Sequence, residues 1–291
     1  MDLTLFVDLA VNGLVIGCIY GLIALGLNLQ YGLMRIMNIA HGEFVMLGAY
    51  LTFSVSTLAG ISPLITIPLV MVILFALGMG LHATVFRQLA RTSASAGDAE
   101  SRSLIVGFGL MFIVQNAATL AWGGGLTGMP YLDKPISFGP TVIVANRLLI
   151  IACMVAISVT LVFTLRRTLI GKAVRGMLEA PLGALLVGID TKKLHPACFA
   201  AGVAMAGLAG GLLSLVYELS PNMGEPYTIS ALVVITLGGL GNLVGGLVGA
   251  VLLGLVESFG MYLGSPSLKP LLTYGVFVLI VLVRPRGLFS K

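Results

Sequence analysis

The chain has 291 residues, of which 58% are hydrophobic and only 9% are charged, and its mean hydropathy is +1.08. A protein of this size with so small a share of charged residues cannot cover its surface with polar groups in water. A soluble globular domain is therefore excluded, and most of the chain must lie in lipid. The formal net charge of +5 is concentrated in a few loops, which indicates membrane orientation rather than a nucleic-acid partner.

Apolar stretches near 20 residues long predict an all-α, polytopic membrane bundle of about eight or nine transmembrane helices in a single domain, residues 1–291. The second and third stretches are separated by Gly60, Ser62 and Pro63, and the last three are the weakest. An acidic start, with Asp2 where a signal peptide would be basic, favours a retained first span. The predicted spans are 5–29, 43–59, 63–86, 104–122, 147–165, 196–216, 228–244, 246–263 and 270–283.

The orientation follows from the positions of the basic residues. Thirteen of the sixteen Lys and Arg residues fall on one side of the predicted spans, and only Lys134, Arg147 and Lys269 fall on the other. Because cytoplasmic loops carry the basic excess, we expect an N-terminus outside and a C-terminus in the cytoplasm of a bacterial cytoplasmic (inner) membrane.

Glycines recur every four residues within several spans, a spacing that lets helix backbones approach closely in lipid. The alternative, a loop that cradles phosphate, is weak because neither the P-loop nor the dinucleotide-binding pattern is complete. We therefore expect no nucleotide site in this chain. No Ser-His-Asp order, paired catalytic carboxylates or intramembrane protease motif occurs either, so we expect no enzyme activity. The glycines assigned to helix packing are Gly13, Gly17, Gly21, Gly241, Gly245 and Gly249.

Polar residues inside or beside the spans are candidates for the solute pathway. Asn12, Asn28 and Asn116 are expected either to join helices by hydrogen bonds or to line a route for a solute. Glu257 is expected to have a snorkelling or interfacial role. The three cysteines, Cys18, Cys153 and Cys198, lack metal-ligand spacing and are expected to be packing residues, so no metal and no cofactor are predicted.

A second polar group precedes the second span. Asn38, His41 and Glu43 could belong to the pathway, but Asn is also a good N-cap, and Glu in a first turn interacts favourably with the helix dipole. The residues alone favour the helix-start interpretation.

The loop at 166–195 separates two spans and carries six basic residues near its ends. Pro181 suits the first position of a helix and Gly188 suits a C-terminal stop, which predicts a short helix at 181–187. The helix is too apolar for water, so it is expected to lie in a groove of a partner protein; the alternative is a helix lying flat on lipid.

Three motifs in order along the chain resemble the permeases of branched-chain amino-acid ABC transporters of the LivH type. They are Tyr20–Gly26 with Asn38–Glu43 and Gly48–Tyr50, then Gly171–Arg175 with Glu179–Ala180 and Gly188–Asp190, and finally Leu237–Asn242 with Gly245 and Gly249.

The resemblance implies an all-helical, type II importer-like permease for branched-chain or related hydrophobic amino acids. Its expected partners are two cytoplasmic ATPases, a homologous second permease, an extracytoplasmic binding protein and membrane lipid. The resemblance assigns Arg175, Glu179, Ala180, Gly188 and Ile189 to the ATPase contact, and Pro181 and Ala184 of the predicted short helix join them as ATPase-coupling residues.

Other functions stay open at this point. Ser230 stands where many members of the family have lysine, and related permeases pass urea, amides or other amino acids. A stand-alone ion-coupled carrier would need more intramembrane acids than Glu43 and Glu257. A membrane scaffold would leave the short apolar helix unexplained.

Overall fold

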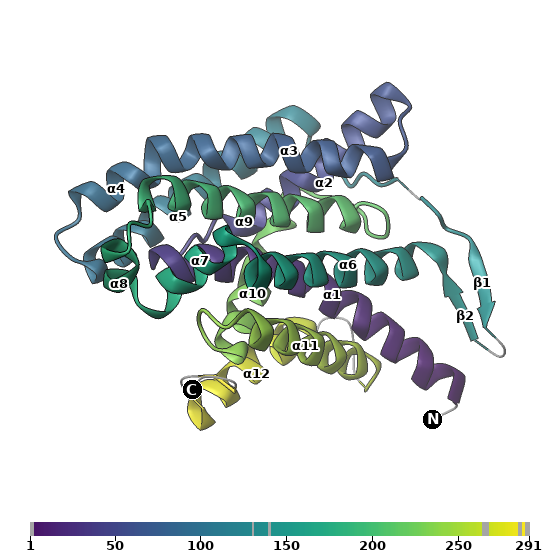
Figure 1. The fold of residues 1–291 in the computed structure, drawn as a ribbon. Helices are drawn as coiled ribbons and strands as arrows, with labels where there is room; N and C mark the ends of the chain where they lie inside the picture. Colours follow the sequence, from purple (N-terminus) through teal and green to yellow (C-terminus); the bar gives the residue numbers. More distant parts are fainter. Residues whose placement is uncertain (1–2, 130, 139–140, 264–267, 285–286, 289–291) are drawn as a thin grey trace.

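The computed structural model describes the chain except residues 1–2, 130, 139–140, 264–267, 285–286 and 289–291 (Figure 1). The described ranges form a helical bundle with one small β-hairpin. The helices, including one π-helical turn η1, are α1 (Leu3–Met34), α2 (His41–Ala59), α3 (Pro63–Leu81), η1 (His82–Phe86), α4 (Arg87–Thr92), α5 (Ala96–Trp122), α6 (Ala145–Arg167), α7 (Leu169–Glu179), α8 (Pro181–Leu186), α9 (Thr191–Leu213), α10 (Gly224–Gly238), α11 (Leu243–Leu263) and α12 (Lys269–Val283).

The prediction of a polytopic helical membrane protein is confirmed at this level. Within the described residues, seven helices are long and apolar enough to cross a membrane. Their outer surfaces are strongly apolar: Ile105 and Leu120 on α5 are 72% and 89% exposed, and Phe163 on α6 is 62% exposed. An apolar surface this extensive needs lipid or another protein against it.

The seventh and eighth predicted spans were placed wrongly. We expected the break near residue 245, but α10 ends at Gly238 and a turn at residues 239–242 precedes α11. Gly239 and Gly241 have φ of +92° and +86° in this turn, a backbone conformation that glycine adopts without strain. Helices α10 and α12 each have 15 residues, about 22 Å at 1.5 Å per residue, so nine full-length crossings stay a prediction.

Helix α1 lies at the centre of the bundle and packs against α11, α9, α10 and α6. Figure 1 shows α2, α3 and α9 on one side of α1 and α11 and α12 on the other. Glycines make the closest of these contacts: a Cβ on Gly17 would lie 2.8 Å from Val251 Cα, and one on Gly13 would lie 2.9 Å from Leu255 Cα. The α1–α11 contact is therefore a backbone-to-backbone approach that any larger residue would push apart.

The other predicted packing glycines lie in different surroundings. A Cβ on Gly21 would meet Met154 of α6, one on Gly245 would meet the Gly238 backbone, and one on Gly249 would meet Leu237. Gly241 was assigned wrongly: it lies in the turn, and nothing stands within 4 Å of the position of a Cβ. Its role follows from its positive φ rather than from helix packing.

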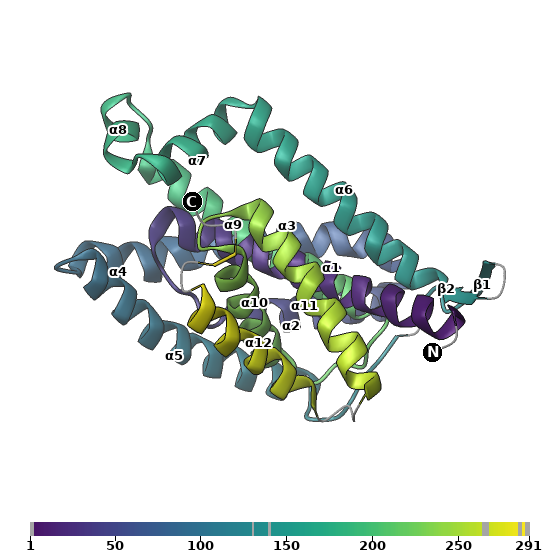
Figure 2. The same ribbon diagram turned by 90° about the horizontal axis from the view of Figure 1, so that it is seen from below.

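The two ends of the bundle differ in charge and structure. We call the end that holds α4, α7 and α8, with Arg35, Arg166 and Arg175, the basic end. The other end, where α1 begins, carries an antiparallel hairpin of β1 (Pro135–Phe138) and β2 (Thr141–Val144), in which Pro135 pairs with Val144; we call it the hairpin end. In Figure 2, α7 and α8 extend from the basic end of α6 at the edge of the molecule.

Helices α2 and α10 both begin inside the bundle. The chain turns back after α1, so that His41 Nε2 lies 3.1 Å from the carbonyl oxygen of Ile23, three turns before the end of α1. The first turn of α10 packs there against α2: Gly42 N–H donates to Thr228 Oγ1 over 2.8 Å, and Thr228 Oγ1 donates to Ile39 O over 3.0 Å. Two helix N-termini therefore meet within the apolar core.

Candidate functional site

The predicted coupling loop forms two helices, of which only the second was expected from the sequence. In α7, Thr168 caps the first turn by accepting a hydrogen bond from Gly171 N–H over 3.0 Å, and Val174 and Met177 are buried. Pro181 opens α8 and Gly188, with φ +84°, follows its end. We missed α7 because it is amphipathic and short, too polar to be read as a membrane span.

Helix α8 is anchored through one small residue. Ala184 is only 4% exposed and packs in a buried cluster with Leu29, Leu33, Leu165 and Leu194. The Ala184 side chain faces the bundle, so a coupling role for Ala184 would be to support α8 from within rather than to form part of its exposed surface.

The opposite face of α8 is apolar and exposed. Leu182, Leu186 and Val187 are 79%, 89% and 79% exposed, and Leu185 is 50% exposed. Residues 182, 185 and 186 share one helix face by their i, i+3 and i+4 spacing. We call these four residues the α8 face. Its position at the tip of the α7–α8 arm leaves it clear of the bundle core (Figure 2).

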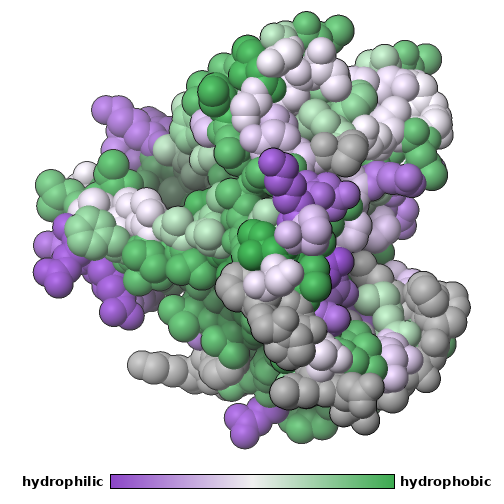
Figure 3. Space-filling view, turned by 90° about the vertical axis from the view of Figure 1, so that its right-hand side faces the viewer, coloured by the Kyte–Doolittle hydropathy of each residue, from purple (hydrophilic) through white to green (hydrophobic). Residues whose placement is uncertain are grey.

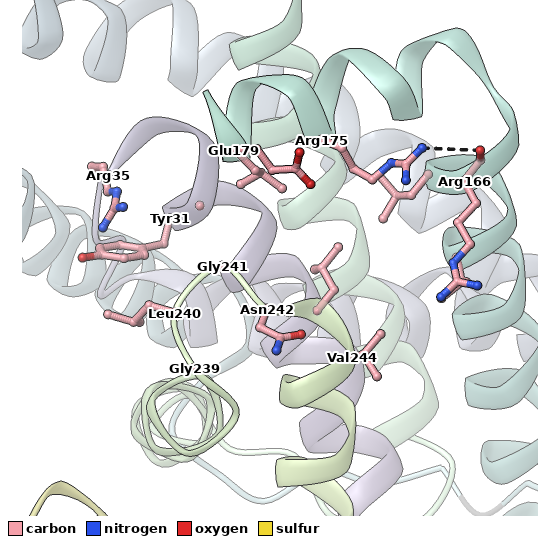
Figure 4. Close-up of a pocket in the computed structure, with 15 residues that line it drawn as sticks. Tyr31, Arg35, Arg166, Arg175, Glu179, Gly239, Leu240, Gly241, Asn242 and Val244 are labelled. Carbon is pink, nitrogen blue, oxygen red and sulfur yellow. Dashed lines mark hydrogen bonds between the residues drawn. The ribbon is translucent and has the colours of Figure 1, made fainter. Parts of the chain in front are cut away.

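Two of the remaining coupling residues, Arg175 and Glu179, line a cleft of about 580 Å³ at the basic end (Figure 4). Arg175 and Glu179 stand on α7, and Arg175 Nη2 donates to the carbonyl oxygen of Arg166 over 3.5 Å. Ala180 is the exposed residue that joins α7 to α8, whereas Ile189 packs against the buried cluster beneath α8. The far wall of the cleft is the turn at 239–242.

Asn28 fastens that turn to α1. Its Oδ1 accepts from Gly241 N–H over 2.7 Å, and its Nδ2 donates to Asn242 O over 3.0 Å. Of the two roles considered for Asn28, the geometry shows the one that joins segments by hydrogen bonds. The turn at 239–242 is therefore held against α1 and faces α7 across the cleft.

The polar group before α2 does not cap the helix as expected. The N-cap position is Ala40, with no side-chain cap, so the prediction for Asn38 was wrong. Asn38 and Glu43 are fully buried, and their side-chain polar atoms have no hydrogen-bond partner among the described residues. Glu43 lies in the first turn of α2, against Gly224 at the start of α10. Because α2 and α10 both begin here, the Glu43 carboxylate can interact favourably with the N-termini of two helices.

Three other polar residues differ in their surroundings. Asn12 Nδ2 donates to Ser258 Oγ over 3.4 Å, which joins α1 to α11, while Asn116 is exposed and donates to Phe112 O of its own helix. Glu257 does not lie at an interface as predicted. It is fully buried and accepts hydrogen bonds from the hydroxyl groups of Tyr20 and Thr273.

Two adjoining clefts at the hairpin end were missed from the sequence. One, of about 480 Å³, is lined mainly by tyrosines and aliphatic residues; the other, of about 400 Å³, is lined by acids and loop backbone. Burial raises the pKa of the Tyr217 hydroxyl, which lies on the wall between them. Figure 3 looks onto this end, and hydrophilic residues gather near the centre of the view. The clefts are built by four segments that lie far apart in the sequence, so no local pattern predicts them. The one sequence signal that points to them is that tyrosines occur on both sides of a loop.

Comparison with known proteins shows which family the amino-acid sequence of the chain matches. A family model described as "Branched-chain amino acid transport system / permease component" matches residues 9–281. The chain is 29% identical to the high-affinity branched-chain amino acid transport system permease protein BraD of Pseudomonas aeruginosa, over 97% of this chain and 94% of the relative. No solved structure matches it significantly.

Two further relatives are similar over most of their length. The LivH permease protein of Escherichia coli K12 is 27% identical over 98% of this chain and 96% of the relative. The LivM permease protein of the same system in that organism is 23% identical over 93% of this chain and 67% of its own. Two differently named permeases of one system are thus both similar to this chain.

Proposed function

The chain belongs to the permease components of branched-chain amino acid transport systems, and from this premise we propose that it is the transmembrane subunit of an ATP-driven importer for branched-chain or related hydrophobic amino acids in a bacterial cytoplasmic membrane. The single observation that carries the proposal is the match over residues 9–281, which takes in all or most of each of the seven helices that, among the described residues, are long and apolar enough to cross a membrane. The names of its relatives, all branched-chain amino acid permeases, support the substrate class.

The α8 face would be the surface on which the ATPase docks and through which its conformational change moves this chain. Four exposed aliphatic side chains on a short arm, clear of the bundle core, fit a groove in a separate protein, and a helix laid into a groove is a common docking mode. No nucleotide motif occurs in the sequence, so a cytoplasmic ATPase on this face is the source of energy in the proposal. Arg175 and Glu179 would stand at the edge of that contact and Pro181 and Gly188 would define the ends of the docked helix.

The membrane orientation in this proposal places the basic end in the cytoplasm and the hairpin end outside. ATP binding would move α7 and α8, and the buried cluster that packs Val174 and Met177 of α7 against Leu29 and Leu33 of α1 would transmit the movement to α1. A homologous permease would cover part of the exposed apolar surface, and a binding protein would deliver the amino acid to the hairpin end. The similarity to both LivH and LivM permeases supports a pair of unlike permeases.

The proposal is tested by reconstitution. The chain is purified with the permease, ATPases and binding protein encoded beside it and placed in lipid vesicles with internal ATP and binding protein outside. We expect labelled leucine, isoleucine and valine to accumulate only when ATP is present, with little competition from urea or acetamide. Uptake by this chain alone, driven by a sodium or proton gradient and indifferent to ATP, would contradict the proposal.

A further inference from the structure

The two clefts at the hairpin end share one wall, the segment 216–218 that follows α9. We call the first the tyrosine cleft; its lining is Ile16, Ile19, Tyr20, Leu213, Val216, Tyr217, Glu218 and Tyr227. We call the second the acidic cleft; its lining includes Asp133, Asn146 and Glu218. Each has a volume within the range of small-molecule sites, about 300–1,000 Å³. Because Val216, Tyr217 and Glu218 line both, the two clefts lie side by side and are separated only by these residues.

The acidic cleft presents acceptors and no basic lining residue among its described lining. Asp133 and Glu218 supply two carboxylates. The Asn146 side chain is 5% exposed and donates to Leu215 O over 3.2 Å, but its Oδ1 has no partner among the described residues. A buried amide oxygen without a partner is costly unless a donor arrives. The 23-residue helix α9 also ends here, and the C-terminus of a helix favours a cation.

The tyrosine cleft shares Glu218 with the acidic cleft but is otherwise lined by aliphatic and aromatic side chains. Four aliphatic side chains and three aromatic rings line it, and the ring centroids of Tyr20 and Tyr227 are 6.3 Å apart. The Tyr20 hydroxyl donates to Glu257 over 2.8 Å, which fixes the Tyr20 ring in the wall. An aliphatic group entering this cleft would leave water for carbon surroundings on several sides, which is favourable by the hydrophobic effect.

We propose that the two clefts together form the binding site for a zwitterionic aliphatic amino acid, with its ammonium group in the acidic cleft and its branched side chain in the tyrosine cleft. Arg147 follows Asn146 on α6 and acts electrostatically on Tyr217; it lines neither cleft, but its positive charge would attract the carboxylate group of the ligand. The inference rests on the proposed function, which places the hairpin end outside and supplies the substrate class.

The test uses the reconstituted complete transporter and a photoactivatable leucine with a diazirine in its side chain. At millimolar concentration and without binding protein, illumination is expected to attach the probe to residues 213–227, and excess leucine is expected to suppress the labelling. The double variant Asp133→Asn with Glu218→Gln should reduce both labelling and uptake by about tenfold or more, as expected when contacts to a charged group are lost. The matched control is Asp8→Asn, an exposed acid at the same end that lines neither cleft.

A second variant reports on selectivity rather than on folding. Tyr217→Ala enlarges the wall between the clefts, so phenylalanine should compete with the probe at least about fivefold better relative to valine than in the wild type. Basal ATP turnover and co-purification with the partners show that each variant is assembled.

The outcomes separate the two proposals. Intact leucine uptake by the wild type, with the probe attached elsewhere and both variants within about twofold of the wild type, would overturn the assignment of the clefts alone. No uptake of any branched-chain amino acid by the wild-type complex would overturn the proposed function, and the cleft assignment with it.

Discussion

Ala184 and Leu186 lie two residues apart and face opposite environments, which makes them a sharp pair of probes. Leu186→Asp changes an 89% exposed side chain, so the fold should keep its stability within about 0.5 kcal/mol while ATP-dependent uptake falls by about tenfold or more. Ala184→Arg forces an unpaired charge into a buried cluster, which should cost about 3–5 kcal/mol and abolish folding of the arm.

Thermal unfolding of each purified variant, followed by uptake in vesicles, distinguishes the two effects. If Leu186→Asp unfolds as easily as Ala184→Arg, the face is structural and the docking role is wrong.

Asn28 offers a second test at this scale. Asn28→Ala removes two hydrogen bonds to the 239–242 turn and leaves Gly241 N–H without a partner, which should cost about 1–3 kcal/mol of stability. Asn116→Ala is the matched control, because Asn116 is exposed and bonds only within its own helix; its effect should stay within about 0.5 kcal/mol. Equal midpoints of thermal unfolding for the two variants would show that the turn does not depend on Asn28.

At the scale of elements, the α1–α11 contact depends on small residues on both helices. Gly17→Leu should separate the two helices, because even a Cβ at this position would lie 2.8 Å from the Val251 backbone. Gly80→Leu in α3 is the matched control, since nothing lies within 4 Å of a Cβ there. We expect Gly17→Leu to lower the midpoint of unfolding by several degrees or to prevent folding, and Gly80→Leu to leave it nearly unchanged. A comparable loss in both would mean that close packing does not hold this pair.

How far the sequence predicted these elements depended on their kind. Long apolar helices such as α1 and α9 can be predicted directly from their sequences, because a membrane span must be apolar along its whole length. The four-residue spacing of the glycines predicted close packing because small residues on one helix face let two backbones approach each other. The turn at 239–242 and helix α7 were missed: the turn interrupts an apolar run through backbone conformation, and α7 is amphipathic.

The site was predicted less completely than the fold. The short helix at α8 followed from Pro181 and Gly188, but the side chain that faces inward, Ala184, could not be identified without the bundle beneath it. The Asn38 side chain was assigned to a cap because the sequence alone does not show that the chain turns back along α1. Both clefts at the hairpin end are made by segments far apart in sequence.

The two ends of the molecule differ: the α7–α8 arm lies at the basic end, and the tyrosine and acidic clefts lie at the hairpin end. If the basic end is cytoplasmic, a cysteine replacing Leu182 should react with a membrane-impermeant maleimide only in inside-out vesicles, and one replacing Asp133 only in right-side-out cells. Cys18 and Cys198 are buried, and the half-buried Cys153 is removed by Cys153→Ala, so the background should be low. Reaction of both replacements from one side would contradict the proposed orientation.

The central claim is that the α8 face is held by a separate ATPase, and cross-linking in the membrane tests it most directly. A photoreactive amino acid at position 186 is compared with one at position 120, which is also 89% exposed but lies on the apolar surface of α5. We expect position 186 to link to the ATPase in a yield that changes with ATP, and position 120 not to link to the ATPase. Attachment of position 186 only to phospholipid, while leucine still accumulates against its gradient, would contradict it.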